Sequence, residues 1–309
     1  MTECRHWLEW AVNALQTPGK VRAKALAGAG AVATQQGDYA VARHYFETSI
    51  RLWRDLGAEG TAGLAEVLHY FGYFTFDQRD YVDARAQFAE SRALYQQLGD
   101  PNIPTILLGD LGMVAYHQGD YAAARAQFEE SLALFQARTD ESSTAEILNR
   151  LGDLARLTDD YAQAATYHEN SLALFRQERS KLGSASGLHK LGYIAQHRQD
   201  YVGAKEYFTE SLKLQQAEGN KQGIAECLAG LAGLAAEKEP ERAVRLFGAV
   251  KAWLDGAGAP LAPAEWAEWK RDEAVARAQL DEAIFDAAWV EGKTLSLEQA
   301  VDYAMKNVK

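Results

Sequence analysis

Histidine side chains are the first candidates for chemistry in this sequence, because they bind metal ions and transfer protons near neutral pH. Four of the seven histidines fall in the first of the two helices predicted for each repeating unit, and these are His69, His117, His189 and His197. His189 and His197 are eight residues apart, about two helical turns, so they lie on roughly the same face of a helix. No third ligand stands between them, which favours polar groups on a binding surface over a metal site.

Sequence motifs of known catalytic and cofactor sites are missing from the chain. There is no Gly-x-x-x-x-Gly-Lys-Ser/Thr, and no Gly-x-Gly-x-x-Gly follows a predicted strand. His-Glu-x-x-His and Gly-x-Ser-x-Gly do not occur either. The carboxylates stand at repeating exposed positions or at helix starts. We therefore predict a non-enzymatic protein with no catalytic residues, no cofactor and no metal.

Composition indicates a helical, water-soluble protein. Of the 309 residues, 48% are apolar and only six are proline, and no apolar run approaches 18 residues. Without a signal-peptide pattern, and with Cys4 and Cys227 matching no metal or disulfide framework, the chain is predicted to be cytoplasmic. The net charge of −11 disfavours direct binding to nucleic acid or to an anionic membrane.

The main feature of the chain is a sequence that recurs about every 40 residues. Its copies align on tyrosines spaced by 42, 40, 40 and 40 residues, which are Tyr39, Tyr81, Tyr121, Tyr161 and Tyr201. A fixed period of this length is typical of a solenoid. Each copy has a Leu-Gly or similar pair in a first helix, and its glycines are Gly30, Gly72, Gly112, Gly152 and Gly192. Glycine inside a helix predicts a close approach between helices.

The second helix of each copy carries small, aromatic and hydroxyl residues at steps of three and four, which place them on one face. Alanine follows the tyrosine by three residues, phenylalanine by seven and serine by ten. His168 replaces the phenylalanine in one copy and is predicted to be a packed histidine bonded locally. An aspartate precedes each tyrosine, where it can cap the helix.

The repeat divides the chain into three parts. Residues 1–16 align with a second helix whose first helix is missing, so we expect a truncated repeat from a longer protein, with a native capping helix as the alternative. Residues 21–258 form about six repeats, the last degenerate. Residues 259–309 lose the period and are predicted to form three helices, near 263–279, 281–290 and 297–306, that cap the array.

This pattern of Leu-Gly, Gly-Asp-Tyr, Ala and Phe resembles the tetratricopeptide repeat. The resemblance covers about 250 residues, and the 40-residue period is similar to the longer-helix subclass. It implies an all-α, right-handed superhelix of antiparallel helix pairs whose first helices line a concave groove. The carboxylate-clamp asparagine of some family members has no counterpart here.

Segments near the C-terminus resemble the end of the repeat region in bacterial STAND ATPase and LuxR-type regulators. They are Arg245-Leu-Phe-Gly-Ala-Val, Gly258-Ala-Pro-Leu-Ala-Pro, and Ala287-Ala-Trp-Val-Glu-Gly-Lys-Thr-Leu-Ser-Leu. In that class the repeats follow an NTPase module and act as a sensor or autoinhibitory arm. The resemblance implies attached NTPase or effector domains in a parent protein.

A binding surface follows from the helical register relative to each Leu-Gly pair. Side chains three residues before the glycine, and one, four and five after it, are expected in the groove. Together with the charged positions discussed next, the candidates are His69, Tyr73, Phe76, Met113, Tyr116, His117, Asn149, Arg150, Asp153, Arg156, His189, Lys190, Tyr193, Gln196 and His197. Aromatic area with a few polar groups suits a peptide, a small effector or a protein segment.

Arg150, Lys190 and Arg156 form a local basic cluster in an otherwise acidic chain. Such a cluster can receive a carboxylate or an acidic peptide segment. The alternative is that these cations make salt bridges within the chain, with Asp110, Asp153 or Glu146.

These observations predict a partner-sensing module that binds a peptide, small effector or protein in the concave groove and biases an attached effector domain. The alternative is a passive protein–protein interaction scaffold, or a chain that self-associates end-on through the exposed apolar face around Trp7 and Trp10.

Overall fold

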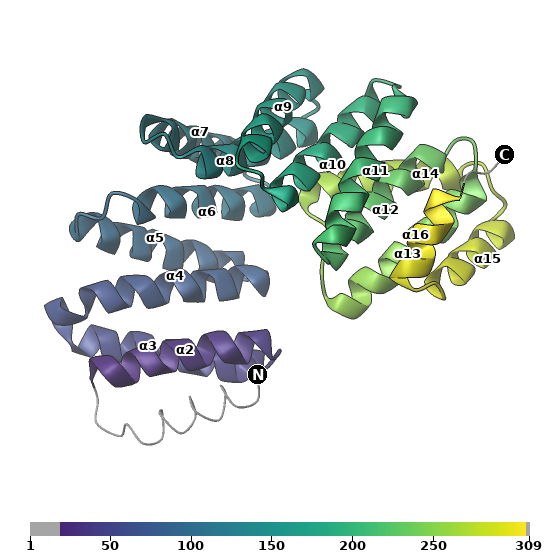
Figure 1. Ribbon diagram of the computed structural model, residues 1–309. Helices are drawn as coiled ribbons and strands as arrows, with labels where there is room; N and C mark the ends of the chain where they lie inside the picture. Colours follow the sequence, from purple (N-terminus) through teal and green to yellow (C-terminus); the bar gives the residue numbers. More distant parts are fainter. Residues whose placement is uncertain (1–18, 307–309) are drawn as a thin grey trace. The chain divides into compact units, whose positions relative to one another are not determined.

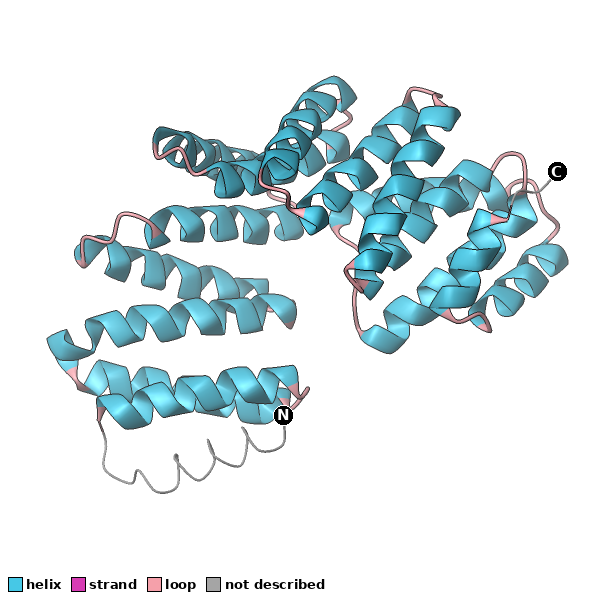
Figure 2. Ribbon diagram, in the orientation of Figure 1, coloured by secondary structure: helices cyan, strands magenta, loops and turns pink. Residues whose placement is uncertain are grey.

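The structure, a computed structural model, describes residues 19–306 and consists of helices joined by short loops (Figures 1 and 2). No strand occurs within these residues, so the predicted all-α class is confirmed. The chain divides into two compact units, Met1–Leu134 and Phe135–Lys309, each described by itself below. The predicted truncated repeat over residues 1–16 lies outside the described residues. Among the described helices, none is long and apolar enough to cross a membrane.

The first unit contains three helix pairs, the last of which runs slightly past the boundary. They are α2 (Lys20–Gln35) with α3 (Tyr39–Asp55), α4 (Thr61–Asp77) with α5 (Tyr81–Gln97), and α6 (Ile103–Gln118) with α7 (Tyr121–Ala137). A 3-10 turn, η1 (Gly57–Gly60), joins the first two pairs. Each predicted second helix begins at its repeated tyrosine.

The second unit continues with three more pairs and three further helices. The pairs are α8 (Glu141–Leu157) with α9 (Tyr161–Gln177), α10 (Lys181–His197) with α11 (Tyr201–Ala217), and α12 (Lys221–Ala235) with α13 (Pro240–Ala257). The predicted helices after the repeat correspond to α14 (Pro263–Arg277), α15 (Glu282–Lys293) and α16 (Leu297–Met305).

The repeated glycine makes room for the repeated aromatic ring. A Cβ atom on Gly112 would lie 2.5 Å from the ring of Phe128, and one on Gly152 would lie 2.5 Å from the ring of His168. The predicted close approach therefore exists. Its partner is the aromatic residue seven positions after the tyrosine.

The repeated serine ties the two helices of a pair together. Ser91 is fully buried, and its hydroxyl donates to the carbonyl of Ala65, 26 residues earlier, at 2.7 Å. Ser171 and Ser211 donate to Ala145 and Ala185 in the same way. A buried hydroxyl needs such a partner, which explains why a serine stands in an otherwise apolar row.

The predicted side-chain capping is found at four of the five helix starts, and α3 begins after Asp38 without such a bond. The side chain of Asp160 accepts from the backbone amide of Gln163 at 3.0 Å, and Asp80, Asp120 and Asp200 make the equivalent bond. These bonds satisfy amides that have no partner inside the helix.

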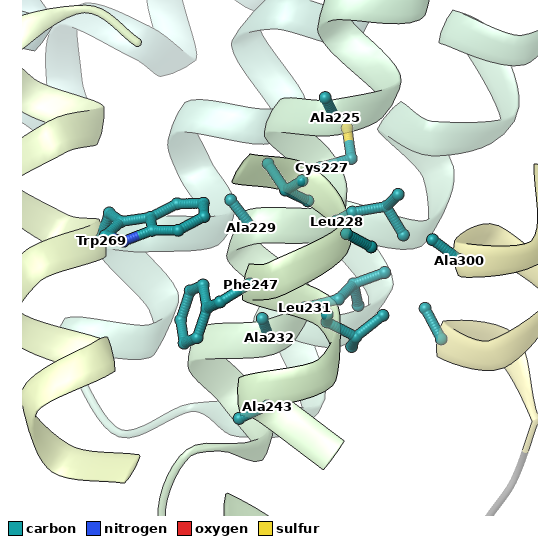
Figure 3. Close-up of a cluster of buried hydrophobic side chains, with 14 of the residues drawn as sticks. Ala225, Cys227, Leu228, Ala229, Leu231, Ala232, Ala243, Phe247, Trp269 and Ala300 are labelled. Carbon is teal, nitrogen blue, oxygen red and sulfur yellow. The ribbon is translucent and has the colours of Figure 1, made fainter. Parts of the chain in front are cut away.

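The apolar core of the second unit joins the last repeat to the helices that follow it. Trp269 of α14 packs against Phe247 of α13 with ring centroids 4.6 Å apart. Figure 3 shows Trp269 beside Phe247, and Ala300 of α16 on the other side of Leu228 and Leu231. The helices α14 to α16 therefore share one core with α12 and α13.

Candidate binding surfaces

First helices form a continuous inner layer in each unit. Helix α2 contacts α4 directly, and α10 contacts both α8 and α12. We call the exposed side of α2, α4 and α6 the unit 1 inner face, and the corresponding side of α8, α10 and α12 the unit 2 inner face. The predicted groove residues are distributed over these two faces.

The unit 1 inner face presents an aromatic stripe on α4. Tyr70 is 51% exposed and Tyr73 is 40% exposed, and the ring of His69 stacks on that of Tyr70 with centroids 6.3 Å apart. Glu66 and Asp77 continue the same stripe, four residues before Tyr70 and four after Tyr73. Burial raises the pKa of Asp77. The stripe is therefore apolar in its middle and acidic at both ends.

Asp110 of α6 supplies a third carboxylate beside these rings. Its side chain is buried and accepts a hydrogen bond of 2.8 Å from the Tyr73 hydroxyl. Nε2 of His69 lies 3.5 Å from the same carboxylate oxygen. Because two rings of α4 converge on one carboxylate of α6, the face is held in shape by polar contacts.

The other predicted residues of unit 1 are less accessible. Tyr116 is only 3% exposed, so it is not available to an external ligand. Phe76 and His117 are half-buried against each other, with centroids 5.1 Å apart, and His117 also stacks on Tyr81. Met113 is half-buried.

The unit 2 inner face is covered by α14, which contacts α8 and α12 (Figure 1). Glu265 of α14 lies between the two predicted cations. Arg156 donates to Glu265 at 2.8 Å, and Lys190 donates to the same oxygen. Asp153 pairs with both cations as well, at 3.0 Å from Arg156 and 3.3 Å from Lys190. The basic cluster thus has both an internal partner on α8 and a carboxylate from a distant helix.

Two more carboxylates of α14 reach the repeats. Glu268 accepts a hydrogen bond of 3.1 Å from the Tyr161 hydroxyl, and Asp272 accepts one of 3.0 Å from Gln196. Arg271 of α14 pairs with both carboxylates, at 2.5 Å from Glu268 and 3.1 Å from Asp272. Glu265, Glu268 and Asp272 form what we call the α14 acidic stripe.

Two effects act on the pKa values of the charged groups in this interface. Burial favours the neutral form of each group, and the ion pairs favour its charged form. Burial alone would raise the pKa of Glu265, but Lys190 and Arg156 hold that pKa well below its usual range. Burial would lower the pKa of Lys190, and Asp153 and Glu265 raise it instead. Burial raises the pKa of Asp272, against the effect of Arg271. Glu265 and Lys190 are therefore both charged near neutral pH.

The remaining buried candidates serve packing and positioning. Nδ1 of His168 lies 2.8 Å from the side-chain oxygen of Asn149, so the predicted local bond of this histidine is confirmed. His189 is 1% exposed and Tyr193 is 2% exposed, and both rings pack on Phe208. Arg150 is half-buried on α8.

Gln196 and His197 line a cavity of about 550 Å³ at the end of α10, with Asp272 and Arg271 on its α14 side. His197 is exposed and stacks on Tyr161. Among residues 19–306, no group of three or more His, Cys, Asp or Glu side chains is arranged to hold a metal ion.

The residues that sequence reasoning missed are those of the α14 acidic stripe. The spacing of Glu265, Glu268 and Asp272, at steps of three and four, places them on one helical face. That signal was present, but a row of carboxylates on a helix usually indicates a solvated surface. Tyr70, two residues before Gly72, is not among the predicted groove residues, and its exposure comes from the structure.

Comparison with known proteins agrees with this architecture. The sequence model described as tetratricopeptide repeat matches residues 63–137 and 102–177. Residues 63–177 are tetratricopeptide repeats. The glycine–ring and serine–carbonyl contacts extend the same repeat to the pairs on either side. No curated protein sequence matches the chain.

Several solved structures share the fold at low identity. A Rap protein complexed with Competence and Sporulation Factor has a TM-score of 0.63 and 10% identity, over 90% of this chain and 80% of that one. NprR in complex with its cognate peptide NprX has a TM-score of 0.61 and 13% identity, over 97% and 89%. A Signal Transduction ATPase with Numerous Domains protein with a tetratricopeptide repeat sensor, from Pyrococcus horikoshii, has a TM-score of 0.59 and 12% identity. The match spans 94% of this chain and 43% of that protein.

Proposed function

We propose that this chain is a non-enzymatic binding module that takes a peptide or a segment of a partner protein on the unit 1 inner face. The observation that carries this proposal is the exposure of Tyr70 and Tyr73 on one stripe of α4. Exposed aromatic rings that lie together, flanked by polar groups, are typical of recognition surfaces.

The chemistry of this face favours a segment with apolar and basic side chains. A Lys or Arg side chain can lie over the rings of Tyr70 and Tyr73, where the π-face attracts a cation. Glu66, Asp77 and Asp110 surround those rings with negative charge. The acidic balance of the whole chain, −11, would also steer a basic partner toward it.

We further propose that the module is the sensor or interaction arm of a larger bacterial signalling regulator. One of the similar solenoids is bound to its cognate peptide and another to Competence and Sporulation Factor, and a third belongs to a multidomain ATPase with a tetratricopeptide repeat sensor. Binding on the inner face would shift the population of repeat conformations only as far as the ligand distinguishes between them. An attached effector domain would respond to that shift.

A displayed random-peptide library provides the test, because no partner has to be chosen in advance. Selection on the full chain should enrich peptides that combine apolar residues with Lys or Arg. Calorimetry with a synthesised peptide should show binding that Tyr70→Ala weakens at least tenfold, about 1.4 kcal/mol. Val82→Ala is the matched control, since Val82 is 74% exposed on the second helix α5.

Loss of binding in the Val82→Ala variant alone, or equal affinity for wild type and Tyr70→Ala, would place the site elsewhere. Absence of any enriched peptide would count against a peptide-binding function altogether.

A further inference from the structure

We propose that the unit 2 inner face is a second binding site, specific for an acidic amphipathic helix, and that α14 is its built-in occupant. This site does not depend on the ligand proposed for unit 1. It assigns a function to the buried charges of α8, α10 and α14, which packing alone does not require.

The receptor half of the site is a set of buried donors on the repeats. The side chain of Arg156 is 0% exposed and that of Lys190 is 10% exposed. Asp153 pairs with both of them, and Glu265 and Glu268 of α14 supply the other carboxylates. If α14 left this face, both cations would be exposed to water, with Asp153 of α8 still paired to them. An acidic ligand that covered the face again would offer them carboxylates in place of that water.

The ligand half of the site is one face of α14. Six of its residues are buried: Ala264, Glu265, Glu268, Trp269, Asp272 and Ala276. Three of these are carboxylates and two are alanines, so Trp269 is the single large apolar group. Its ring packs on Phe247 of α13, whereas the carboxylates face the repeats. The contact of α14 with α8, α9 and α10 is thus largely polar, whereas Trp269 joins α14 to the apolar core of α12 and α13.

An ionic contact of this kind is specific but exchangeable. Buried ion pairs add little net stability, because the charges regain their hydration when they separate. The connectors on both sides of α14 contain exposed residues, among them Gly258 and Pro260 before it and Gln279 and Asp281 after it. A partner helix with carboxylates at the same spacing, i, i+3 and i+7, would compete with α14 for Arg156, Lys190 and Gln196.

A labelled peptide of residues 260–280 is the probe for this competition. It is titrated into the full chain and into a Glu265→Gln/Glu268→Gln variant, in which the resident helix has lost two carboxylates. We expect saturable binding to the variant, at least tenfold tighter than to wild type. The same peptide with glutamine at both positions should not bind, and adding Lys190→Met to the variant should abolish binding.

Glu282→Gln/Glu298→Gln is the control, because it removes two exposed carboxylates of α15 and α16 and should not admit the peptide. Equal binding of the acidic and glutamine peptides, or equal binding to variant and control, would overturn the proposal.

Hydrogen exchange on the wild-type chain gives a second measurement that does not rely on variants. If α14 is a releasable occupant, its amides should exchange faster than those of α10 and α12, through an opening smaller than global unfolding. Exchange of α14 together with α12 and α13 as one unit would contradict the proposal even if the peptide bound.

Discussion

At the residue scale, His189 shows how the buried cations affect a neighbouring ring. Its imidazole is 1% exposed and lies beside Lys190, with Arg156 and Glu265 close enough to influence it. Burial and then the charge of Lys190 lower the pKa of His189 to about 3. The ring is therefore neutral in the folded protein throughout the physiological range.

This neutrality predicts a loss of stability in mild acid. An unfolded histidine takes up a proton near pH 6.5, whereas folded His189 does not, so protons favour the unfolded state below that pH. The stabilising effect is fully present above pH 6.5 and declines as the pH falls toward 3. Relative to a His189→Phe variant, the wild-type free energy of unfolding should fall by about 2 kcal/mol between pH 7 and pH 5.

Urea denaturation at the two pH values measures this difference, since both chains share every other titrating group, including His168. Replacing exposed His44 with phenylalanine should leave the pH dependence as in wild type. A His189→Phe variant with the same pH dependence as wild type would show that the ring is protonated when folded.

At the element scale, the turn before each second helix imposes a left-handed backbone whatever residue stands there. The five equivalent residues all have positive φ, and they are Gly37, Arg79, Gly119, Asp159 and Gln199. Two are glycine, for which this conformation is free of strain. The other three pay a conformational cost that the turn geometry requires.

Arg79→Gly should therefore stabilise the first unit. Relief of the left-handed strain, about 1–2 kcal/mol, outweighs the extra chain entropy of glycine, about 0.5–1 kcal/mol. We expect a net gain of about 0.5–1 kcal/mol, measured as a shift of the urea midpoint. Gly119→Ala, at the same position of the next repeat, should lower stability by about 1 kcal/mol. If Arg79→Gly and Gly119→Ala both lowered stability, contacts of the Arg79 side chain would outweigh the relief of backbone strain.

At the scale of the whole molecule, the repeats were predictable because their contacts are local and recurrent. A glycine meets the ring 16 residues later, and a serine reaches the carbonyl 26 residues earlier, in copy after copy. One period in the sequence therefore determines the helix pairs, their caps and their packing.

The position of α14 could not be predicted in this way. Its polar contacts with α8, α9 and α10 join residues 75 to 110 positions apart, such as Lys190 with Glu265 and Arg271 with Tyr161, and they occur once. The sequence revealed the basic cluster and left its partner open between an acidic segment and internal salt bridges. The structure shows salt bridges within the chain, to Asp153 of α8 and to Glu265 of α14. Tyr116 and Tyr193, expected in the groove by register, are buried because neighbouring helices cover that side of the ring.

This long-range contact predicts how far a local change spreads. In a solenoid each repeat is stabilised mainly by its neighbours, but α14 links α8 to α12. Arg156→Met removes one partner of a buried ion cluster, which typically costs about 3–5 kcal/mol. Hydrogen exchange should therefore accelerate together in α8, α10 and α14, and stay unchanged in α2 to α5.

Arg43→Met is the matched comparison in the first unit. Arg43 pairs with Asp80 and Asp83 at 3.2 Å, but its side chain is 37% exposed, so its loss should cost no more than about 1 kcal/mol. Its effect should be confined to α3 and the adjoining α4 and α5. If Arg156→Met accelerated exchange in α8 alone, α14 would not couple the stability of neighbouring repeats. The ion pairs of Arg156 would then stabilise only the helix that carries it.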